Sequence, residues 1–193
     1  MWQIDCWPDV HFFPRSVSQL LALANPSNYH FLLLEWPYED REWLAIDPWK
    51  GDQSLQAAMQ RELAIRYGTT SYFHDLVESF NGRTVFIDSL ALRQSNPQLV
   101  ETMYYQRDQF MASFVERLIR INPHPTRALL VTGILHVPAL LQMLSAVQMQ
   151  CARDFKEAKD DFMAMLRDTL TTRAYQAAFS EDQFKRLRWY HTL

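Results

Sequence analysis

The segment Arg127-Ala-Leu-Leu-Val-Thr-Gly-Ile-Leu-His-Val-Pro-Ala-Leu-Leu-Gln-Met-Leu-Ser-Ala-Val147 is the most informative part of this chain. It has no charged residue after Arg127, and one glycine and one histidine lie near its middle. Only four glycines occur in the chain, far below the usual share of about 7%. A β-type run, then Gly133-x-x-His136, then a helix-type run predicts that His136 lies at a strand-to-helix turn, where α/β proteins hold their reactive groups.

The length of this uncharged run also raises the alternative of a membrane-spanning helix, which needs about 20 apolar residues. Three features argue against it. Ala128–Thr132 is short and β-like, Gly133 and Pro138 interrupt the run, and His136 would lie at mid-bilayer, where ionisable groups are costly. We therefore expect a buried strand, a turn and a helix rather than a membrane span.

Length and composition indicate an ordinary globular domain. The chain has 193 residues, of which 48% are hydrophobic and 21% charged, and its net charge of −3 with no block of lysine or arginine disfavours nucleic acid as a partner. No signal peptide is recognised after Met1, so a cytoplasmic location is expected. Cys6 and Cys151 have neither the spacing of a disulfide framework nor that of a zinc site, and we expect both to be reduced.

Four short apolar runs predict strands, at Gln3–Trp7, His30–Trp36, Arg83–Asp88 and Arg127–Thr132. The last three are continuous rather than alternating, which is typical of strands buried on both faces of a parallel sheet. Helical stretches separate the strands, so the predicted fold is α/β: a mainly parallel sheet of four or more strands flanked by helices, with a C-terminal helical extension.

The predicted helices are delimited by capping residues, glycines and prolines. They are a helix capped by Ser16, Gln53–Tyr67 ended by Gly68, Ser71–Phe80 ended near Asn81-Gly82, a long helix from Asn96-Pro97 to Ile121, and Val137–Ala152. The charged tail Asp154–Tyr190 predicts one or two amphipathic helices. We accordingly expect an α/β core over residues 1–152 and a helical extension over 153–193 that packs on the core or on a partner, including a second copy of the chain.

Polar residues follow the carboxyl ends of all four predicted strands. The first strand leads into Asp9-Val10-His11, the second ends at Glu35, the third at Asp88, and the fourth leads to His136. In an open parallel sheet these ends share one edge, so the side chains are expected to converge there. Two imidazoles with two or three carboxylates suit proton transfer or metal binding.

Each of these residues also has a purely structural interpretation. Asp9 and His11 can form a turn beside two prolines, Glu35 can belong to a structural ion pair, and Asp88 can cap a turn or helix. His136 can be a helix N-cap or a hydrogen-bonded core histidine. The other histidines have no supporting context and are interpreted as structural: His30, His74, His124 and His191.

The long helix contains an arginine on its apolar face. Apolar residues recur at three- and four-residue steps from Met103 to Leu118, and Arg107 lies on that stripe between Met103 and Met111. A buried guanidinium needs an anion, since an unpaired buried charge is very costly. Glu35, Asp88 or a substrate group could be that anion. The alternative is an arginine whose head group reaches past the stripe to water.

Two elements of the sequence resemble the erythromycin esterase/ChaN/TraB/Tiki superfamily. Arg107-Asp108-Gln109-Phe110-Met111-Ala112 resembles its Arg-(Asp/Asn)-x-x-Met-Ala helix, and Leu130–Pro138 resembles its second Gly-x-x-His element, in the same order and at a similar separation. Pro8-Asp9-Val10-His11 is similar to the first motif, usually Gly-Glu-x-His, with proline for glycine and aspartate for glutamate. Leu33-Leu34-Glu35 resembles the strand that ends in a glutamate.

The resemblance covers roughly residues 4–147 and implies an α/β sheet with one polar pocket. Members include esterases with a histidine general base, metal-dependent peptidases and haem- or iron-associated lipoproteins. The implied site consists of Asp9, His11, Glu35, Arg107 and His136.

The leading hypothesis for the function is a hydrolase of an ester or amide bond in a small-molecule or peptide substrate. In it, His11 is the general base held by Asp9 or Glu35, and Arg107 and His136 stabilise the oxyanion. In a variant of this hypothesis, His11, His136 and one carboxylate bind a divalent metal ion. The rival hypothesis is a non-catalytic binding domain, favoured by the altered first motif and by the many large aromatic residues.

Overall fold

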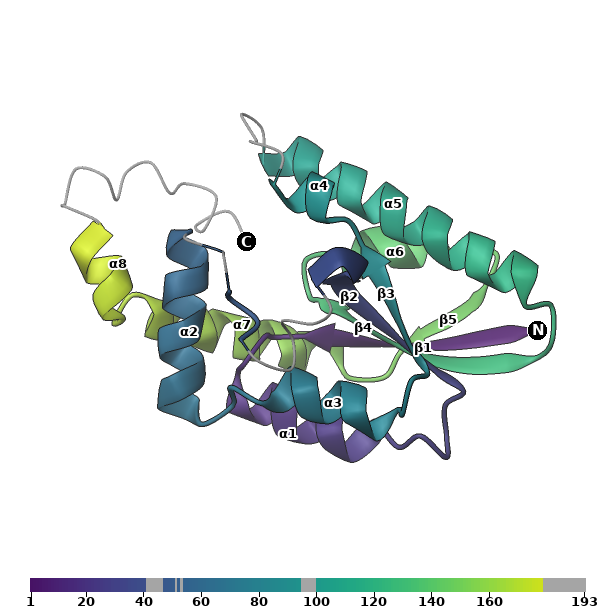
Figure 1. The fold of residues 1–193 in the computed structure, drawn as a ribbon, viewed down its shortest axis with the longest axis horizontal. Helices are drawn as coiled ribbons and strands as arrows, with labels where there is room; N and C mark the ends of the chain where they lie inside the picture. The colour runs from purple at the N-terminus through teal and green to yellow at the C-terminus, as the bar shows by residue number, and fades with distance from the viewer. Residues whose placement is uncertain (41–46, 51, 53, 95–99, 179–193) are drawn as a thin grey trace.

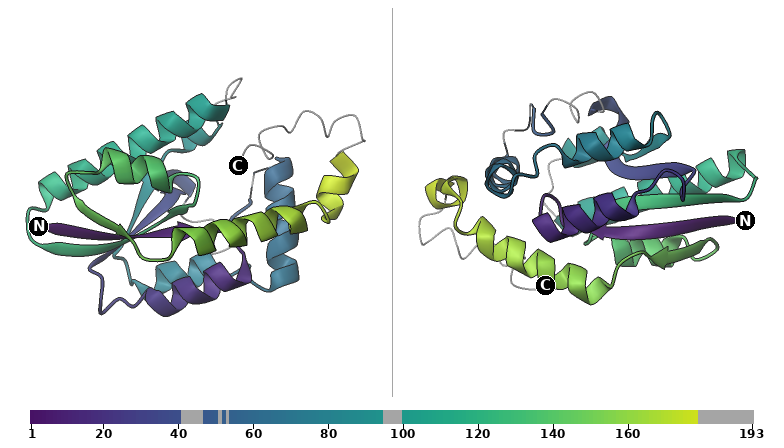
Figure 2. Two further views of the ribbon diagram at one scale, coloured as in Figure 1. Left: turned by 180° about the vertical axis from the view of Figure 1, so that it is seen from behind. Right: turned by 90° about the horizontal axis from the view of Figure 1, so that it is seen from below.

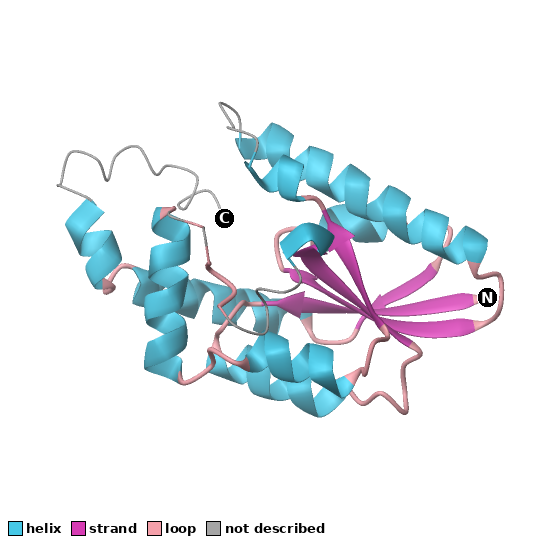
Figure 3. Ribbon diagram, in the orientation of Figure 1, coloured by secondary structure: helices cyan, strands magenta, loops and turns pink. Residues whose placement is uncertain are grey.

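The computed structural model describes residues 1–40, 47–50, 52, 54–94 and 100–178. At its centre is a sheet of five parallel strands in the order β3-β2-β4-β1-β5. The strands are β1 (Trp2–Asp9), β2 (Phe31–Pro37), β3 (Thr84–Asp88), β4 (Thr126–Gly133) and β5 (Gln148–Cys151). The predicted α/β fold with a parallel sheet is confirmed (Figures 1 and 3).

Helices connect the strands and cover both faces of the sheet (Figure 1). They are α1 (Pro14–Leu23), the short 3-10 helix η1 (Tyr38–Asp40), α2 (Leu55–Tyr67), α3 (Tyr72–Ser79), α4 (Leu90–Gln94), α5 (Val100–Ile121), α6 (Val137–Met143), α7 (Phe155–Thr169) and α8 (Arg173–Ala178).

The strand at the centre of the sheet is β4, the first half of the uncharged segment. It pairs with β2 on one side and β1 on the other, and the side chains of Leu129, Leu130 and Val131 are buried. The chain then turns at Gly133 and enters α6, as the buried strand–turn–helix interpretation predicted. Across the ranges that the structure describes, no helix is both long and apolar enough to span a bilayer.

Two apolar cores lie on the two faces of the sheet, because successive strand residues point to opposite sides. One contains Trp7 and Leu34 with side chains of α1, α2 and α3, and the other contains Ile4 and Leu33 with side chains of α5 and α6. Figure 2 shows α5 and α6 on one side of the sheet and α1 and α3 on the other. The strand ends are thereby held between two packed layers.

The predicted helix Val137–Ala152 is wrong in its second half. Helix α6 ends at Met143, and Gln148–Cys151 forms β5, the edge strand that pairs in parallel with β1. Three of the four β5 residues are exposed, so no buried apolar run marked it as a strand. Pairing with β1 gives its backbone groups partners, and that gain outweighs a weak local preference.

The start of α1 also differs from the prediction. Phe13 is its N-cap residue and Pro14 its first residue, whereas Ser16 lies inside the helix and is buried. The predicted helix ends at Gly68 and near Asn81-Gly82 are confirmed, and Gly68 has the left-handed backbone typical of a C-cap. The predicted start at Asn96-Pro97 lies outside the described residues, as do Gln53 and the tail after Ala178.

The C-terminal helices α7 and α8 are attached to the core through charged and polar groups. Asp161 of α7 is buried and accepts hydrogen bonds from Arg15 of α1 and from Arg153, which follows β5. Glu62 of α2 accepts from the backbone N–H of Arg173 at the start of α8. Figure 1 shows α8 beside α2, beyond the carboxyl ends of the strands.

Candidate active site

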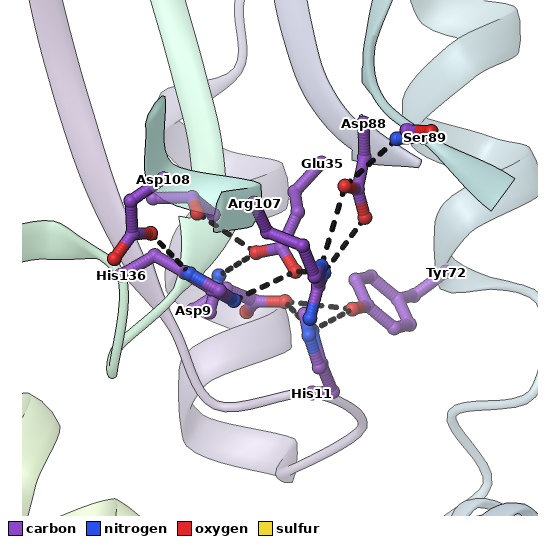
Figure 4. Close-up of polar contacts among 11 residues, drawn as sticks. Asp9, His11, Glu35, Tyr72, Asp88, Ser89, Arg107, Asp108 and His136 are labelled. Atoms are coloured by element: carbon purple, nitrogen blue, oxygen red, sulfur yellow. Dashed lines mark hydrogen bonds and ion pairs between the residues drawn. The ribbon is translucent and has the colours of Figure 1, made fainter. Parts of the chain in front are cut away.

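The polar residues predicted at the strand ends lie in one cluster made of two hydrogen-bonded groups, one around Asp9 and one around Glu35 (Figure 4). Asp9 is the last residue of β1, Glu35 lies near the end of β2, and Asp88 is the last residue of β3. His136 follows the turn after β4, and Arg107 reaches over from α5. All five sequence-predicted site residues, Asp9, His11, Glu35, Arg107 and His136, belong to this cluster or border it.

His11 and Asp9 form a hydrogen-bonded pair. The Nδ1 atom of His11 lies 2.6 Å from Oδ2 of Asp9. An ionised carboxylate only accepts hydrogen bonds, so Nδ1 carries the proton and, in the neutral ring, Nε2 carries the lone pair. The His11 side chain is 26% exposed whereas that of Asp9 is fully buried. This arrangement leaves Nε2 as the basic atom of the pair.

Two hydroxyl groups support Asp9 from the helix side. Tyr72 of α3 donates to Oδ2 of Asp9 at 2.7 Å, and Ser16 of α1 donates to Oδ1 at 3.1 Å. Ser16 in turn accepts from the backbone N–H of Val10. Burial, with the charge of Asp9 nearby, raises the pKa of Tyr72 well above its usual value, so the hydroxyl stays a donor. Asp9 is therefore fixed as an acceptor.

The residue after His11 has a strained backbone. Phe12 has φ of 64°, a value that bulky side chains rarely adopt, and such outliers cluster at functional sites. Its side chain is buried and packs edge-on against the ring of Phe73, while its carbonyl accepts from the hydroxyl of Thr69 at 2.7 Å. The ring of His11 also lies beside Phe73. Packing thus holds the turn that aims His11.

Glu35 is the centre of a second group of polar residues. Its Oε1 atom lies 2.5 Å from Nη2 of Arg107 and 3.3 Å from Nε2 of His136. Its Oε2 atom accepts from the Thr132 hydroxyl at 2.8 Å and from the Gly133 backbone N–H at 2.6 Å. Four donors surround one carboxylate that is 4% exposed. Glu35 therefore joins Arg107, His136 and the end of β4 through one buried carboxylate.

Arg107 meets two buried carboxylates, as its position on the apolar stripe predicted. Besides Glu35, it contacts Asp88 through Nη2 at 2.7 Å and through Nε at 3.3 Å. Burial disfavours its charge, but Glu35 and Asp88 more than offset this effect and raise the pKa of Arg107 above its usual value. The alternative in which the head group reaches water is wrong, since the residue is 7% exposed. Asp88 also accepts from the backbone N–H of Ser89, which agrees with its turn-capping interpretation.

His136 lies between two carboxylates. Its Nδ1 is 2.5 Å from Oδ1 of Asp108, the residue after Arg107 on α5, and its Nε2 faces Glu35. Burial alone would lower its pKa, but the charge of Glu35 and the hydrogen bonds to Asp108 and Glu35 raise the pKa of His136 to about 9. At neutral pH the ring is thus an imidazolium that donates from both nitrogens. As the N-cap of α6 it makes no side-chain cap bond.

Gly133 separates the His11–Asp9 pair from the group around Glu35. A Cβ atom added there would lie 3.4 Å from His11 Nε2, 3.4 Å from Glu35 Oε2 and 3.8 Å from His136 Cδ2. The lone-pair nitrogen of His11 therefore faces the side of Gly133 that Glu35 and His136 also border. With hydrogen in place of a side chain, Gly133 puts no carbon atom between these three side chains.

The arrangement of these residues does not fit a divalent metal ion. Within the described part of the chain, no group of three or more His, Cys, Asp or Glu side chains is placed to hold one. Both nitrogens of His136 face carboxylates, so the ring has no lone pair to offer a metal while it is an imidazolium.

Sequence reasoning gave no site role to four members of the cluster, namely Ser16, Tyr72, Asp108 and Thr132. Asp108 was visible in the Arg-Asp motif, but it received no role because it follows Arg107 directly. Tyr72 lies in a segment with no recognisable motif, and Ser16 was interpreted as a helix cap. A hydroxyl near a buried carboxylate has no short-range sequence signal, because Tyr72 and Asp9 are 63 positions apart.

Comparison of the chain with models of known protein families, with curated proteins and with solved structures gave no match. The geometry of the site is therefore the basis for its assignment.

Proposed function

We propose that this protein is a hydrolase of an ester or amide bond, with His11 as the general base. One observation carries the proposal: Asp9 binds Nδ1 of His11 at 2.6 Å, so that Nε2 points toward the position where a side chain of residue 133 would begin, which glycine leaves without a Cβ atom. A base held by an orienting carboxylate, next to a position that a reacting atom can occupy, is the arrangement that water activation requires.

The proposed reaction begins with a water molecule hydrogen-bonded to His11 Nε2. As the water oxygen attacks the substrate carbonyl, Nε2 takes its proton, and the buried charge of Asp9 stabilises the resulting imidazolium. The bond to the leaving group then breaks, and Nε2 returns the proton to the leaving oxygen or nitrogen. The products are a carboxylic acid and an alcohol or amine.

In this proposal the positive charges of the two cations around Glu35 stabilise the oxyanion electrostatically, since both N–H groups of His136 already face carboxylates. His136 and His11 border the same side of Gly133. Arg107 is paired with Glu35, the carboxylate that His136 also faces. Both are held by carboxylates in a buried setting, so they need little reorganisation when charge develops on the carbonyl oxygen. Glu35, Asp88 and Asp108 act as positioning residues because each contacts one or both of these cations.

We also propose a distant relationship to the erythromycin esterase/ChaN/TraB/Tiki superfamily. The residues that carry the resemblance are those that meet in the cluster, including Asp108 of the Arg-Asp motif.

We also propose that two copies of the chain form a homodimer through the C-terminal helices. Light scattering of the purified chain tests this proposal.

The function is tested with p-nitrophenyl acetate, p-nitrophenyl butyrate and a matched p-nitroanilide. We expect hydrolysis by the wild-type chain, and a loss of about 10²–10⁴-fold in kcat/KM for His11→Gln. His124→Gln, at an exposed position, is the matched control and should keep full activity. Equal rates for His11→Gln and wild type would exclude the hydrolase mechanism and leave the rival binding function.

A second measurement does not depend on the substrate. Nitrogen NMR of the imidazole rings should show His11 protonated at Nδ1 in its neutral form, and Asp9→Asn should change that tautomer preference. A neutral His11 protonated at Nε2 would remove the base from the proposed mechanism.

A further inference from the structure

The two cysteines of the chain are direct neighbours in the sheet. Cys6 of β1 and Cys151 of β5 are register partners, and the carbonyl of Cys6 accepts from the backbone N–H of Ala152 at 2.8 Å. Parallel strands lie about 4.8 Å apart. This spacing falls within the Cα separation of about 4.4–6.8 Å that disulfides span.

Both side chains point to the same face of the sheet. Ile4 and Cys6 belong to the apolar core next to α5 and α6, and Met149, the register partner of Ile4, packs against that core. Residues two apart in a strand share a face, so Cys151 lies on the same side as Met149 and hence as Cys6. The charge of either thiolate would affect the other, since Cys151 contributes to the raised pKa of Cys6.

The two thiols differ in access to solvent. Cys151 is exposed on the edge strand, whereas Cys6 is fully buried. An external oxidant therefore reaches Cys151 first, and the only described thiol that can then attack within the same chain is Cys6.

We propose that Cys151 and Cys6 form a redox-sensitive modification site, at which a small-molecule disulfide such as oxidised glutathione closes a bridge between β5 and β1. The Cys151 thiolate attacks the small disulfide, forms a mixed disulfide and releases one thiolate. The Cys6 thiolate then attacks the Cys151 sulfur, forms the protein disulfide and releases the second small thiolate. The two cysteine protons pass to the released thiolates, and the small disulfide is reduced to two thiols.

The position of the bridge suits a reversible cross-link. Burial raises the pKa of the Cys151 thiol as well as that of Cys6, so the exchange is slow at neutral pH and faster at higher pH. Strand β5 has four residues and lies at the edge of the described sheet beside β1, so the bond would join an edge strand to its neighbour. The bridge would fasten the strand that leads into Arg153 and α7.

The test uses the full-length reduced protein and oxidised glutathione at pH 8.5. We expect free thiols, counted after denaturation, to fall from two to none, and mass spectrometry of unreduced peptides to show Cys6 joined to Cys151. The melting temperature should rise by about 2–10 °C, because the bridge closes a long loop, and should return after dithiothreitol. Hydrogen exchange over β5 should slow in the oxidised form.

Cys151→Ser and Cys6→Ala are the matched variants. Cys151→Ser should retain one thiol that resists oxidised glutathione in the folded state. Cys6→Ala should stop at a mixed disulfide on Cys151, and if this variant does not fold, Cys151→Ser and the peptide map decide. Retention of glutathione on Cys151 of the wild type, or a dimer linked through Cys151, would overturn the proposal.

Discussion

At the scale of single residues, the hydrogen-bond partners of each side chain determine which of its atoms are available to a substrate. Asp9 accepts from Nδ1 of His11, and in the proposed mechanism this leaves Nε2 as the base. Four donors surround Glu35, and in the same proposal that carboxylate positions its neighbours and accepts no proton from the substrate. Two acidic residues at equivalent strand ends thus acquire different functions from their surroundings.

Arg107→Met is expected to destabilise the fold, because it leaves Glu35 and Asp88 without their shared cation. Breaking a buried ion pair from one side costs about 3–5 kcal/mol in the free energy of unfolding. Arg117→Met, at an exposed position of the same helix, is the control and should change that free energy by no more than about 0.5 kcal/mol. Urea denaturation measures both, and similar midpoints for the two variants would refute the structural role of the cluster.

The protonation of His136 gives the stability of the protein a distinct pH dependence. Its pKa is about 9 in the folded protein, against 6.5 for the free side chain. The folded state therefore binds more protons between these values, so this contribution is complete below pH 6.5 and is lost as the pH rises through 9. The stability difference between wild type and His136→Ala should shrink over this range, by up to about 1.4 kcal/mol per pH unit.

The control for this measurement is His124→Ala, since His124 is exposed. Its stability relative to wild type should not change over the same pH range. A constant difference between wild type and His136→Ala from pH 6.5 to pH 9 would mean that His136 is neutral in the folded protein.

At the scale of elements, the turn between β4 and α6 joins the two halves of the site. Its glycine supplies a backbone N–H to Glu35 and places no side chain between Glu35 Oε2 and His11 Nε2. The turn is held by the backbone bond from Ile134 N–H to the Asp9 carbonyl at 3.0 Å, so it is tied to the end of β1.

Gly133→Ala is expected to lower activity far more than stability. The added methyl group would meet His11 Nε2 and Glu35 Oε2 at 3.4 Å, which is tolerable packing but occupies the position in front of the base. Gly68→Ala is the opposite control. The position beside Gly68 is open, but its φ of 68° disfavours a side chain. The variant should therefore lose about 1 kcal/mol in the free energy of unfolding and keep its specific activity. Full activity in Gly133→Ala would show that substrate does not approach His11 over this glycine.

Sequence patterns predicted the elements that are long, buried and periodic. The continuous apolar runs of β2 and β4 follow directly from burial, as do Met111 and Val115 of the α5 stripe. Phe110 and Phe114 of that stripe are exposed instead. Arg107 was recognisable because its charge interrupts the stripe. Strand β5 escaped because it is exposed and depends on pairing with β1. Asp108 was not predicted, because the sequence does not say which way α5 is rotated about its axis. The packing of α5 against the sheet sets that rotation and turns Asp108 toward His136.

At the scale of the whole molecule, the C-terminal helices are linked to the core by buried charge. Arg153 contacts Asp161 and stacks over the indole of Trp7, a residue of the core on β1. Asp161 also binds Arg15 of α1, so one carboxylate of α7 contacts both α1 and the segment that follows β5. The division at residues 152 and 153 predicted from sequence therefore needs a test by unfolding.

We expect the core and helix α7 to unfold together. Urea denaturation followed by tryptophan fluorescence and by far-ultraviolet circular dichroism should give coincident curves. Asp161→Ala should lower the midpoint, because it leaves Arg153 buried without its carboxylate. Two separate transitions in the wild type, with the helical signal lost first, would support the predicted division into a core and an independent extension.

The strand order has a consequence for how the chain folds during synthesis. Strand β1 pairs with β4 and β5, and β2 pairs with β3 and β4, so the first strand has no neighbour among those made before Thr126. The ribosome must therefore release the segment Thr126–Gly133 before β1 can enter the sheet, and until then the apolar face of β1 needs protection from aggregation. The same event brings Gly133 between His11 and Glu35, so the catalytic arrangement proposed above and the completed sheet would arise in a single late step of biogenesis.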